Sequence, residues 1–145
     1  MKRILFVCMG NICRSPTAEG VINKIIINNK LENIVKVDSA ATHGYHIGEP
    51  PDPRSCAAAL RRGIDLSVQR ARKVAPEDFE RFDLLLAMDR DNLALLKRGA
   101  RPEHHAKLGL FMRYATRFQV DEVPDPYYGS TRDFVYGQLG VASYT

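Results

Sequence analysis

The sequence alternates short apolar runs with amphipathic stretches, and this alternation constrains the fold more than any other feature. Residues 2–7 form an apolar run typical of a strand that is buried on both faces. Comparable runs predict strands at residues 35–39, 84–87 and 107–110. Strands that alternate with helices form parallel sheets. We therefore expect an α/β fold of three layers, in which a four-stranded parallel sheet is flanked by helices on both faces.

Helices are expected in the segments that connect these strands. The first begins at Ser15-Pro16, because serine suits the N-cap and proline the first helical position. Its buried stripe comprises Ala18, Val21, Ile22 and Ile25, which recur at helical spacing. Further helices are expected at residues 54–62, which Gly63 closes, and at residues 76–82 and 91–97.

Length and composition indicate one folded domain over residues 1–145. A chain of 145 residues with 45% hydrophobic and 26% charged residues has globular values and needs no disulfide or structural metal. Its longest apolar runs, residues 4–9 and 84–88, are too short to cross a bilayer, and no signal-peptide pattern is present. Three cysteines are an odd number and do not suggest a disulfide framework. We expect a cytoplasmic protein without membrane association, whose thiols are either reactive or simply buried.

The net charge of +4 comes from dispersed basic residues, which are densest over residues 54–72. No aromatic residues alternate with them, and no nucleic-acid-binding motif is present. A solvated basic face with some attraction for anionic substrates is the expected role of this charge, and nucleic acid is not an expected partner.

The chemistry begins where the first strand ends, in the segment Cys8-Met9-Gly10-Asn11-Ile12-Cys13-Arg14-Ser15. Five residues separate the cysteine from the arginine, in a loop that enters a helix N-terminus. Such a loop can turn successive backbone N–H groups inward, and the helix dipole adds positive potential. The segment therefore predicts an anion cradle that fits phosphate. The spacing alone also occurs by chance, but the strand before it and the helix after it argue against chance.

Individual side chains in this loop have distinct expected roles. The positive potential favours a thiolate at Cys8, which makes it the candidate nucleophile. The planar guanidinium of Arg14 can meet two phosphate oxygens at once. Ser15 can donate its hydroxyl to the thiolate, Gly10 permits a positive φ, and the amide of Asn11 can brace the loop from within.

A second segment, Asp125-Pro126-Tyr127-Tyr128-Gly129, holds an acidic residue beside two aromatic ones. With this segment the sequence resembles the low-molecular-weight protein tyrosine phosphatases over about residues 2–134. The motifs that carry the resemblance come in family order: the cysteine loop, then residues 38–42 (DSAAT), 67–72 (SVQRAR), 87–89 (AMD) and 125–129 (DPYYG).

The resemblance implies a two-step hydrolysis of phosphotyrosine in proteins or peptides, with inorganic phosphate as product. Cys8 attacks phosphorus while Asp125 protonates the leaving phenolate, and water then hydrolyses the cysteinyl-phosphate with Asp125 as base. No metal or cofactor is required, because Arg14 and the loop amides supply the electrostatic stabilisation.

The resemblance also assigns supporting residues. Ser39 is expected to hydrogen-bond Asn11 and brace the loop, although an ordinary strand-end hydroxyl is an equal alternative. Tyr45 and Tyr127 match aromatic positions that wall the mouth of the site, where a deep slot admits phosphotyrosine and excludes phosphoserine. Tyr128 is either a further substrate contact or a packed surface aromatic.

Three other functions compete with this hypothesis. Protein-arginine phosphatases on the same fold carry threonine where Ile12 stands here. Arsenate reductases use two further cysteines late in the chain, and this chain has none after Cys56. A phosphate-binding module without activity is the third alternative, and the presence of Cys8, Arg14 and Asp125 argues against it.

The remaining expectations concern residues outside the main motifs. The histidines, at positions 43, 46, 104 and 105, lack metal-ligand spacing to the cysteines and are expected to be solvated. Cys13 either forms a reversible disulfide with Cys8 or is a buried packing residue. Gly137 and Gly140 weaken the C-terminal helix that relatives carry. Residues 137–145 are therefore expected to be frayed or irregular, in a monomer or a weakly self-associating protein.

Overall fold

The computed structural model describes residues 1–114 and 122–123. Its sheet consists of β1 (Lys2–Cys8), β2 (Val35–Ala41), β3 (Leu84–Ala87) and β4 (Leu108–Leu110). The strands are all parallel and stand in the order β2-β1-β3-β4. In the register Ile4 lies opposite both Val37 and Leu84, so β1 is the strand between the two halves of the sheet. The predicted four-stranded parallel sheet is confirmed.

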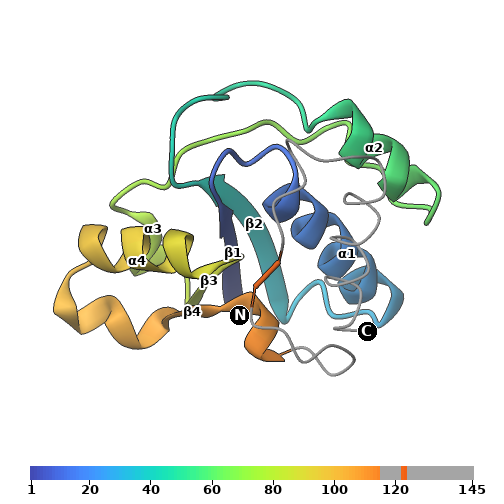
Figure 1. Cartoon of the computed structure of the whole chain (residues 1–145). Coiled ribbons are helices and arrows are strands. Elements are labelled where there is room, and N and C mark those ends of the chain that lie inside the picture. The colour runs from blue at the N-terminus through green and yellow to red at the C-terminus, as the bar shows by residue number, and fades with distance from the viewer. Residues whose placement is uncertain (115–121, 124–145) are drawn as a thin grey trace.

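Helices cover both faces of this sheet (Figure 1). They are α1 (Arg14–Asn28), α2 (Pro53–Leu60), α3 (Asp78–Arg81) and α4 (Arg90–Gly99), with 3-10 turns at Pro102–Lys107 and Phe111–Tyr114. Helix α1 packs against β1 and β2 on one face, and α4 packs against β3 and β4. Figure 1 shows α1 and α2 on one side of the sheet and α3 and α4 on the other. The three predicted layers are therefore present.

The alternation of side chains along β1 divides the core in two. Phe6 and Cys8 point to the α1 side, where they join a cluster with Ala18 and Val21. Leu5 and Val7 point the other way and pack with residues of α3, α4 and β4. Successive strand residues face opposite sides of a sheet, so a strand that is apolar at every position must be covered on both.

Two details of the helices differ from expectation. Ser15 is not the N-cap of α1, because the helix begins at Arg14, and its N-cap residue Cys13 makes no side-chain capping bond. The Ser15 hydroxyl contacts the Cys8 sulfur instead. Helix α2 begins one residue earlier than expected, at Pro53, because Asp52 caps it by accepting the Arg54 N–H at 2.8 Å.

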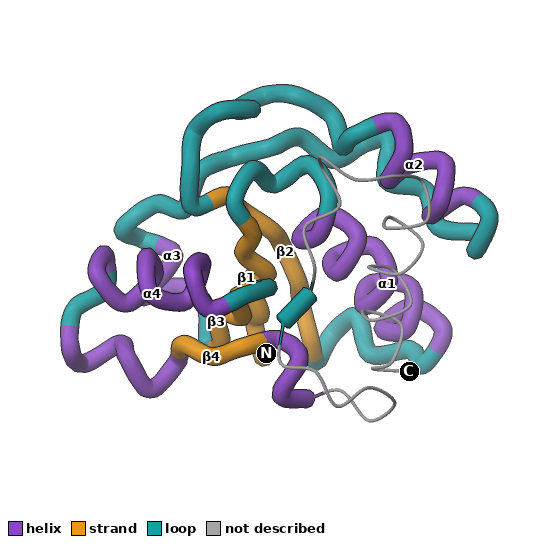
Figure 2. Tube along the Cα trace, viewed as in Figure 1, coloured by secondary structure: helices purple, strands orange, loops and turns teal. Residues whose placement is uncertain are grey.

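The topology fixes where a site can form. From β1 the chain crosses to β2 on one side and then returns to β3 on the other, so the direction of winding changes at β1. Ligands in such sheets bind at the carboxyl ends of the strands beside this switch point. Figure 2 shows the loop after β1 and the long connection after β2 at that end. Cys8, the last residue of β1, is therefore at the expected place.

Within the described residues no helix is long and apolar enough to cross a membrane. Residues 137–145, and with them the expectation of an irregular C-terminus, lie outside the described part of the chain.

Candidate functional site

The loop between β1 and α1 is built around one residue in the left-handed region. Asn11 has φ of +58°, whereas Gly10, where a positive φ was expected, does not. Asparagine tolerates this region better than most residues because its short side chain can bond locally. Position 10 is instead tightly packed, because a Cβ atom there would lie 3.0 Å from Cδ2 of His46, which would have to shift.

Three donors converge on the sulfur of Cys8. The Asn11 N–H donates at 3.3 Å and the Ser15 N–H at 3.5 Å, while the Ser15 hydroxyl oxygen lies 3.0 Å from the sulfur. Cys8 itself is 2% exposed, at the bottom of the loop. Backbone N–H groups that point into one loop bind an anion, and a sulfur at their focus is placed for attack on it.

The side-chain amide of Asn11 joins the loop to the rest of the protein. Its Nδ2 donates to the hydroxyl oxygens of Ser15 at 2.7 Å and Ser39 at 3.0 Å. Its Oδ1 accepts the backbone N–H of Arg72 at 3.1 Å, which fixes the orientation of the amide. The bond between Ser39 and Asn11 that the family resemblance implied is thus present.

These contacts determine where the hydroxyl protons of Ser15 and Ser39 point. An amide NH₂ group only donates, so both serine oxygens accept from Asn11, and the proton of each serine is left for another partner. The proton of Ser15 is directed to the Cys8 sulfur. The proton of Ser39 goes to Oε1 of Glu19 at 2.6 Å. A continuous chain of hydrogen bonds therefore runs from the nucleophile candidate to a carboxyl group on α1.

Glu19 is half-buried, and its surroundings perturb its ionisation. Burial raises the pKa of this carboxyl from 4.5 to about 7, opposed by the hydrogen bond from Ser39 and by the charge of Arg72, and assisted by the charge of Asp38. The carboxyl group therefore changes protonation state near neutral pH.

Arg14 is 4% exposed and is held from the far side of the switch point. Its Nη1 donates to Oδ2 of Asp89 at 2.6 Å and to the carbonyl of Val123 at 3.0 Å. Asp89 follows β3 directly and is also the N-cap of α4, where its Oδ1 accepts the Asn92 N–H at 2.8 Å. The site is therefore assembled from the ends of β1 and β3.

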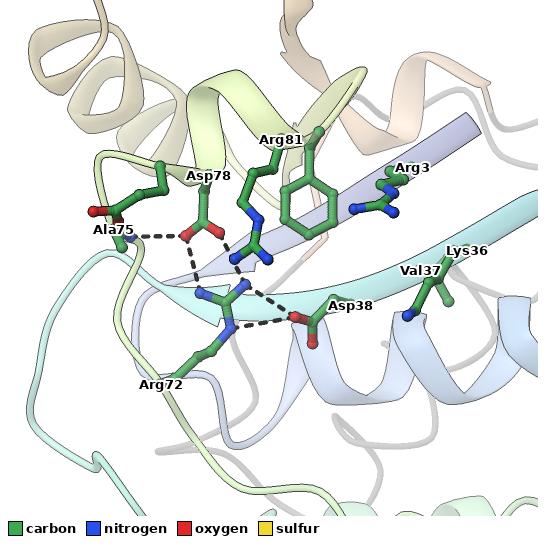
Figure 3. A pocket seen from close by; sticks show the side chains of 10 residues that line it. Arg3, Lys36, Val37, Asp38, Arg72, Ala75, Asp78 and Arg81 are labelled. Carbon is green, nitrogen blue, oxygen red and sulfur yellow. Dashed lines mark hydrogen bonds and ion pairs between the residues drawn. The ribbon is translucent and has the colours of Figure 1, made fainter. Parts of the chain in front are cut away.

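Arg72, drawn between Asp38 and Asp78 in Figure 3, braces the loop on its other side through its backbone N–H. Its guanidinium lies between two carboxylates, 3.0 Å from Asp38 and 2.9 Å from Asp78. Asp78 is itself held by the Ala75 N–H at 2.8 Å. Arg72 lines a pocket of about 470 Å³ with its side chain, while its backbone N–H holds Asn11. A partly buried network of ion pairs thus fixes the residue that orients the loop amide.

Residues 42–49 follow β2 and begin beside the loop, where the His43 N–H donates to the Met9 carbonyl at 3.0 Å. Tyr45 is 72% exposed and stacks on His43, with ring centroids 5.1 Å apart. His46 pairs with Glu49 and lies against Gly10. The expectation of solvated histidines is wrong for His43, His46 and His104, because all three are half-buried and in contact with other side chains.

Cys13 lies behind the loop and is 5% exposed. It packs with Ile12, Ala58 and Ala71 in a small apolar cluster. All three cysteines are free thiols in this structure. The packing alternative for Cys13 is thus present, and its redox role stays a prediction.

The predicted site residues are only partly within the described chain. Cys8, Arg14, Ser15, Asn11 and Ser39 come together as described above, whereas Asp125, Tyr127 and Tyr128 lie outside the described residues.

Sequence reasoning assigned no role to Asp89, Glu19 or Arg72. Asp89 had a local signal, since an aspartate that precedes a helix and follows a strand is both an N-cap and a site candidate. The other two act through contacts distant in sequence and had no such signal.

Comparisons with known proteins agree with this geometry. A family model described as "Low molecular weight phosphotyrosine protein phosphatase" matches residues 3–137. Proteins of that name from Gallus gallus and Homo sapiens are 44% and 45% identical over 142 and 141 residues, which cover 95% and 94% of this chain and 89% and 88% of theirs. The crystal structure of a protein tyrosine phosphatase from Entamoeba histolytica matches with a TM-score of 0.96 and 36% identity, covering 99% of this chain and 92% of that one.

Proposed function

Because the chain belongs to the low molecular weight phosphotyrosine protein phosphatase family, we propose that Cys8, Arg14 and Asp125 carry out its hydrolysis of phosphotyrosine. The protein is a cysteine-dependent protein tyrosine phosphatase, a hydrolase. The observation that carries the assignment of roles is the convergence of two N–H groups and one hydroxyl on the sulfur of Cys8, at 3.0 to 3.5 Å.

The first step transfers the phosphoryl group to sulfur. The thiolate of Cys8 attacks phosphorus, the bond from phosphorus to the tyrosine oxygen breaks, and the oxygen takes a proton from Asp125. The loop amides and Arg14 hold the other phosphate oxygens as negative charge spreads over them. The Ser15 hydroxyl supports this step because its proton, directed to the sulfur, stabilises the thiolate form that attacks.

The second step releases phosphate. Water attacks the cysteinyl-phosphate, Asp125 takes its proton, and the sulfur leaves as a thiolate that the Ser15 hydroxyl and two N–H groups stabilise. Support for Asp125 in this role comes from the resemblance and from Val123, two residues before it, whose carbonyl accepts a hydrogen bond from Arg14.

The depth of the site and its aromatic walls explain why phosphotyrosine is the proposed substrate. Cys8 is buried at the base of its loop, so a phosphate group must reach it on a long side chain, which phosphotyrosine has and phosphoserine lacks. Tyr45 is proposed to stack on the substrate ring, with Tyr127 and Tyr128 as the other wall. The substrates are proteins or peptides that carry phosphotyrosine, and Ile12 in the loop favours them over phosphoarginine.

A nucleophilic thiol works where thiols are kept reduced, so we place the enzyme in the cytoplasm. The three free thiols in the structure support this location. We propose that the enzyme is a monomer or associates weakly with itself.

The test compares the wild type with Cys8→Ser on matched peptides that carry phosphotyrosine, phosphoarginine or phosphoserine. We expect turnover of phosphotyrosine alone, and its loss in Cys8→Ser, while vanadate still binds because the amides and Arg14 are unchanged. Turnover near the wild-type rate in Cys8→Ser would refute the mechanism. Preferred turnover of the phosphoarginine peptide would make the chain an arginine phosphatase.

A further inference from the structure

Glu19 is the last group of the hydrogen-bond chain that starts at the nucleophile. The links run from the Cys8 sulfur to Ser15 at 3.0 Å, from Ser15 to Asn11 at 2.7 Å, from Asn11 to Ser39 at 3.0 Å, and from Ser39 to Glu19 at 2.6 Å. Ser39 is 4% exposed, so its proton has no access to bulk water. Glu19 is the acceptor that keeps this buried hydroxyl satisfied and leaves its oxygen free to accept from Asn11.

The groups around Glu19 do not neutralise a carboxylate. From β2 the charged neighbour is Asp38, which is also negative, and from the segment before α3 it is Arg72. The charge of Arg72 is already shared by Asp38 and Asp78. No ion pair joins Glu19 to any residue in the described part of the chain.

Where the segment that follows α2 lies against Gly20, the residue next to Glu19, its nearest side chains are uncharged. These side chains are Ile64, Leu66 and Gln69. The side-chain amide of Gln69 donates a hydrogen bond to the carbonyl oxygen of Pro16 at 3.1 Å. An ionised Glu19 would therefore stand as a largely uncompensated negative charge on the helix that begins at the phosphate-binding loop.

We propose that Glu19 is a positioning residue for the phosphate-binding loop that works in its neutral form, and that its ionisation weakens the binding of anions in the loop. Both forms accept the proton of Ser39, because a neutral carboxyl keeps a carbonyl oxygen. The two forms differ in charge, and only the carboxylate opposes the positive potential that holds phosphate. The inference rests on the proposed function in one respect, namely that the loop from Cys8 to Ser15 binds phosphate.

The ionisation falls in a range where the effect matters. Burial raises the pKa of Glu19 to about 7, so the neutral acid predominates below that pH and the carboxylate above it. At an effective dielectric constant of about 20 and with partial screening, a unit charge at the far end of this hydrogen-bond chain changes anion affinity about three- to tenfold. The enzyme therefore binds anions more tightly in mildly acidic solution, and this increase is separate from any change in the charge of the substrate itself.

The experiment measures sulfate binding, because sulfate is a phosphate analogue that does not titrate between pH 5.5 and 8. The chemical shifts of the loop amides are followed during titration with sodium sulfate at constant ionic strength, once at pH 5.5 and once at pH 8. The proteins are the wild type, Glu19→Gln, Glu19→Ala and, as a matched control, Glu32→Gln, which removes an exposed carboxylate. Glutamine retains the acceptor oxygen and cannot ionise, whereas alanine removes both properties.

We expect Glu19→Gln to bind sulfate as the wild type does at pH 5.5 and about three- to tenfold more tightly than the wild type at pH 8. Glu19→Ala should bind more weakly than Glu19→Gln at both pH values, because the Ser39 proton loses its acceptor. Glu32→Gln should follow the wild type. An identical change of affinity with pH in the wild type and Glu19→Gln would overturn the proposal.

The same data separate this proposal from the assignment of the site. If sulfate shifts no loop amide in any of the four proteins, the loop is not the anion site, and the proposed function fails first. If sulfate binds and phosphotyrosine is hydrolysed while Glu19→Gln behaves as the wild type at both pH values, only the role of Glu19 is refuted.

Discussion

Arg14 and Asp89 form an ion pair of 2.6 Å that joins the first residue of α1 to the residue after β3. Asp89 uses one carboxylate oxygen for Arg14 and the other for the N-terminus of α4. The side chain of Arg14 is 3% exposed, so the pair is largely out of water on the arginine side. A single aspartate therefore holds the arginine that we propose to bind phosphate and caps a helix on the other face of the sheet.

Substitution of Asp89 should uncouple these two roles. In Asp89→Asn the cap oxygen is kept, but buried Arg14 loses the carboxylate of Asp89 as a partner, and the loss of one partner of such a pair costs on the order of 3 kcal/mol of unfolding free energy. Phosphate or vanadate supplies the missing negative charge, so these ligands should raise the melting temperature of Asp89→Asn more than that of the wild type. Thermal unfolding with and without ligand measures both effects.

The control for this prediction is Asp91→Asn, in the first turn of the same helix. Asp91 is exposed, and its substitution should change the unfolding free energy by no more than about 0.5 kcal/mol. Equal ligand stabilisation in Asp89→Asn and the wild type would show that phosphate does not replace Asp89 as the partner of Arg14.

Substitution of Asp125 should separate substrates by their leaving groups. Asp125→Asn removes the proton donor, so hydrolysis of aryl phosphates with poor leaving groups should slow by roughly 10²- to 10⁴-fold. Substrates whose leaving group needs no proton should lose much less. Steady-state rates over a series of substituted phenyl phosphates measure this dependence, and an equal loss for every member would remove Asp125 from the role of acid.

The fold could be predicted from the sequence because its signals are local. A strand such as β1, apolar at consecutive positions, must be covered on both faces, and the order of strands and helices then leaves a parallel sheet as the arrangement. The start of α1 was misplaced for a related reason. The signal at Ser15-Pro16 is an N-cap signal, but the serine hydroxyl is used by Cys8, and the helix begins one residue earlier.

The central residues of the site also had local signals in the sequence, whereas the contacts that hold them in place had none. Cys8, Arg14 and Ser15 lie within one short segment whose spacing carries the chemistry. Arg72 and Asp89 reach the site across 61 and 75 residues of sequence, through contacts that depend on how the segments pack. The N-cap position of Asp89 had a local signal, but its contact with Arg14, and that of Arg72 with Asn11, can be found only once the fold brings the segments together.

The role of Cys13 can be tested through recovery from oxidation. If Cys13 traps oxidised Cys8 as a disulfide, peroxide followed by dithiothreitol should restore activity in the wild type and far less in Cys13→Ala, because the unprotected thiol is oxidised further. Cys56→Ala is the control, since Cys56 lies on α2 and should recover as the wild type does. Equal recovery in all three proteins would leave Cys13 with packing against Ile12 and Ala58 alone.

The titration of Glu19 also predicts how stability depends on pH. The pKa of Glu19 is raised from 4.5 to about 7 in the folded protein, so between these values the folded state keeps a proton that the unfolded state has lost. The contribution of protonated Glu19 to the free energy of unfolding is fully present below pH 4.5. It falls as the pH rises and is lost above about pH 7. The full change is at most about 3 to 4 kcal/mol, since each pKa unit corresponds to about 1.4 kcal/mol. In urea unfolding at several pH values, the stability of the wild type relative to Glu19→Gln should decline over this window, and a difference that is constant with pH would contradict the prediction.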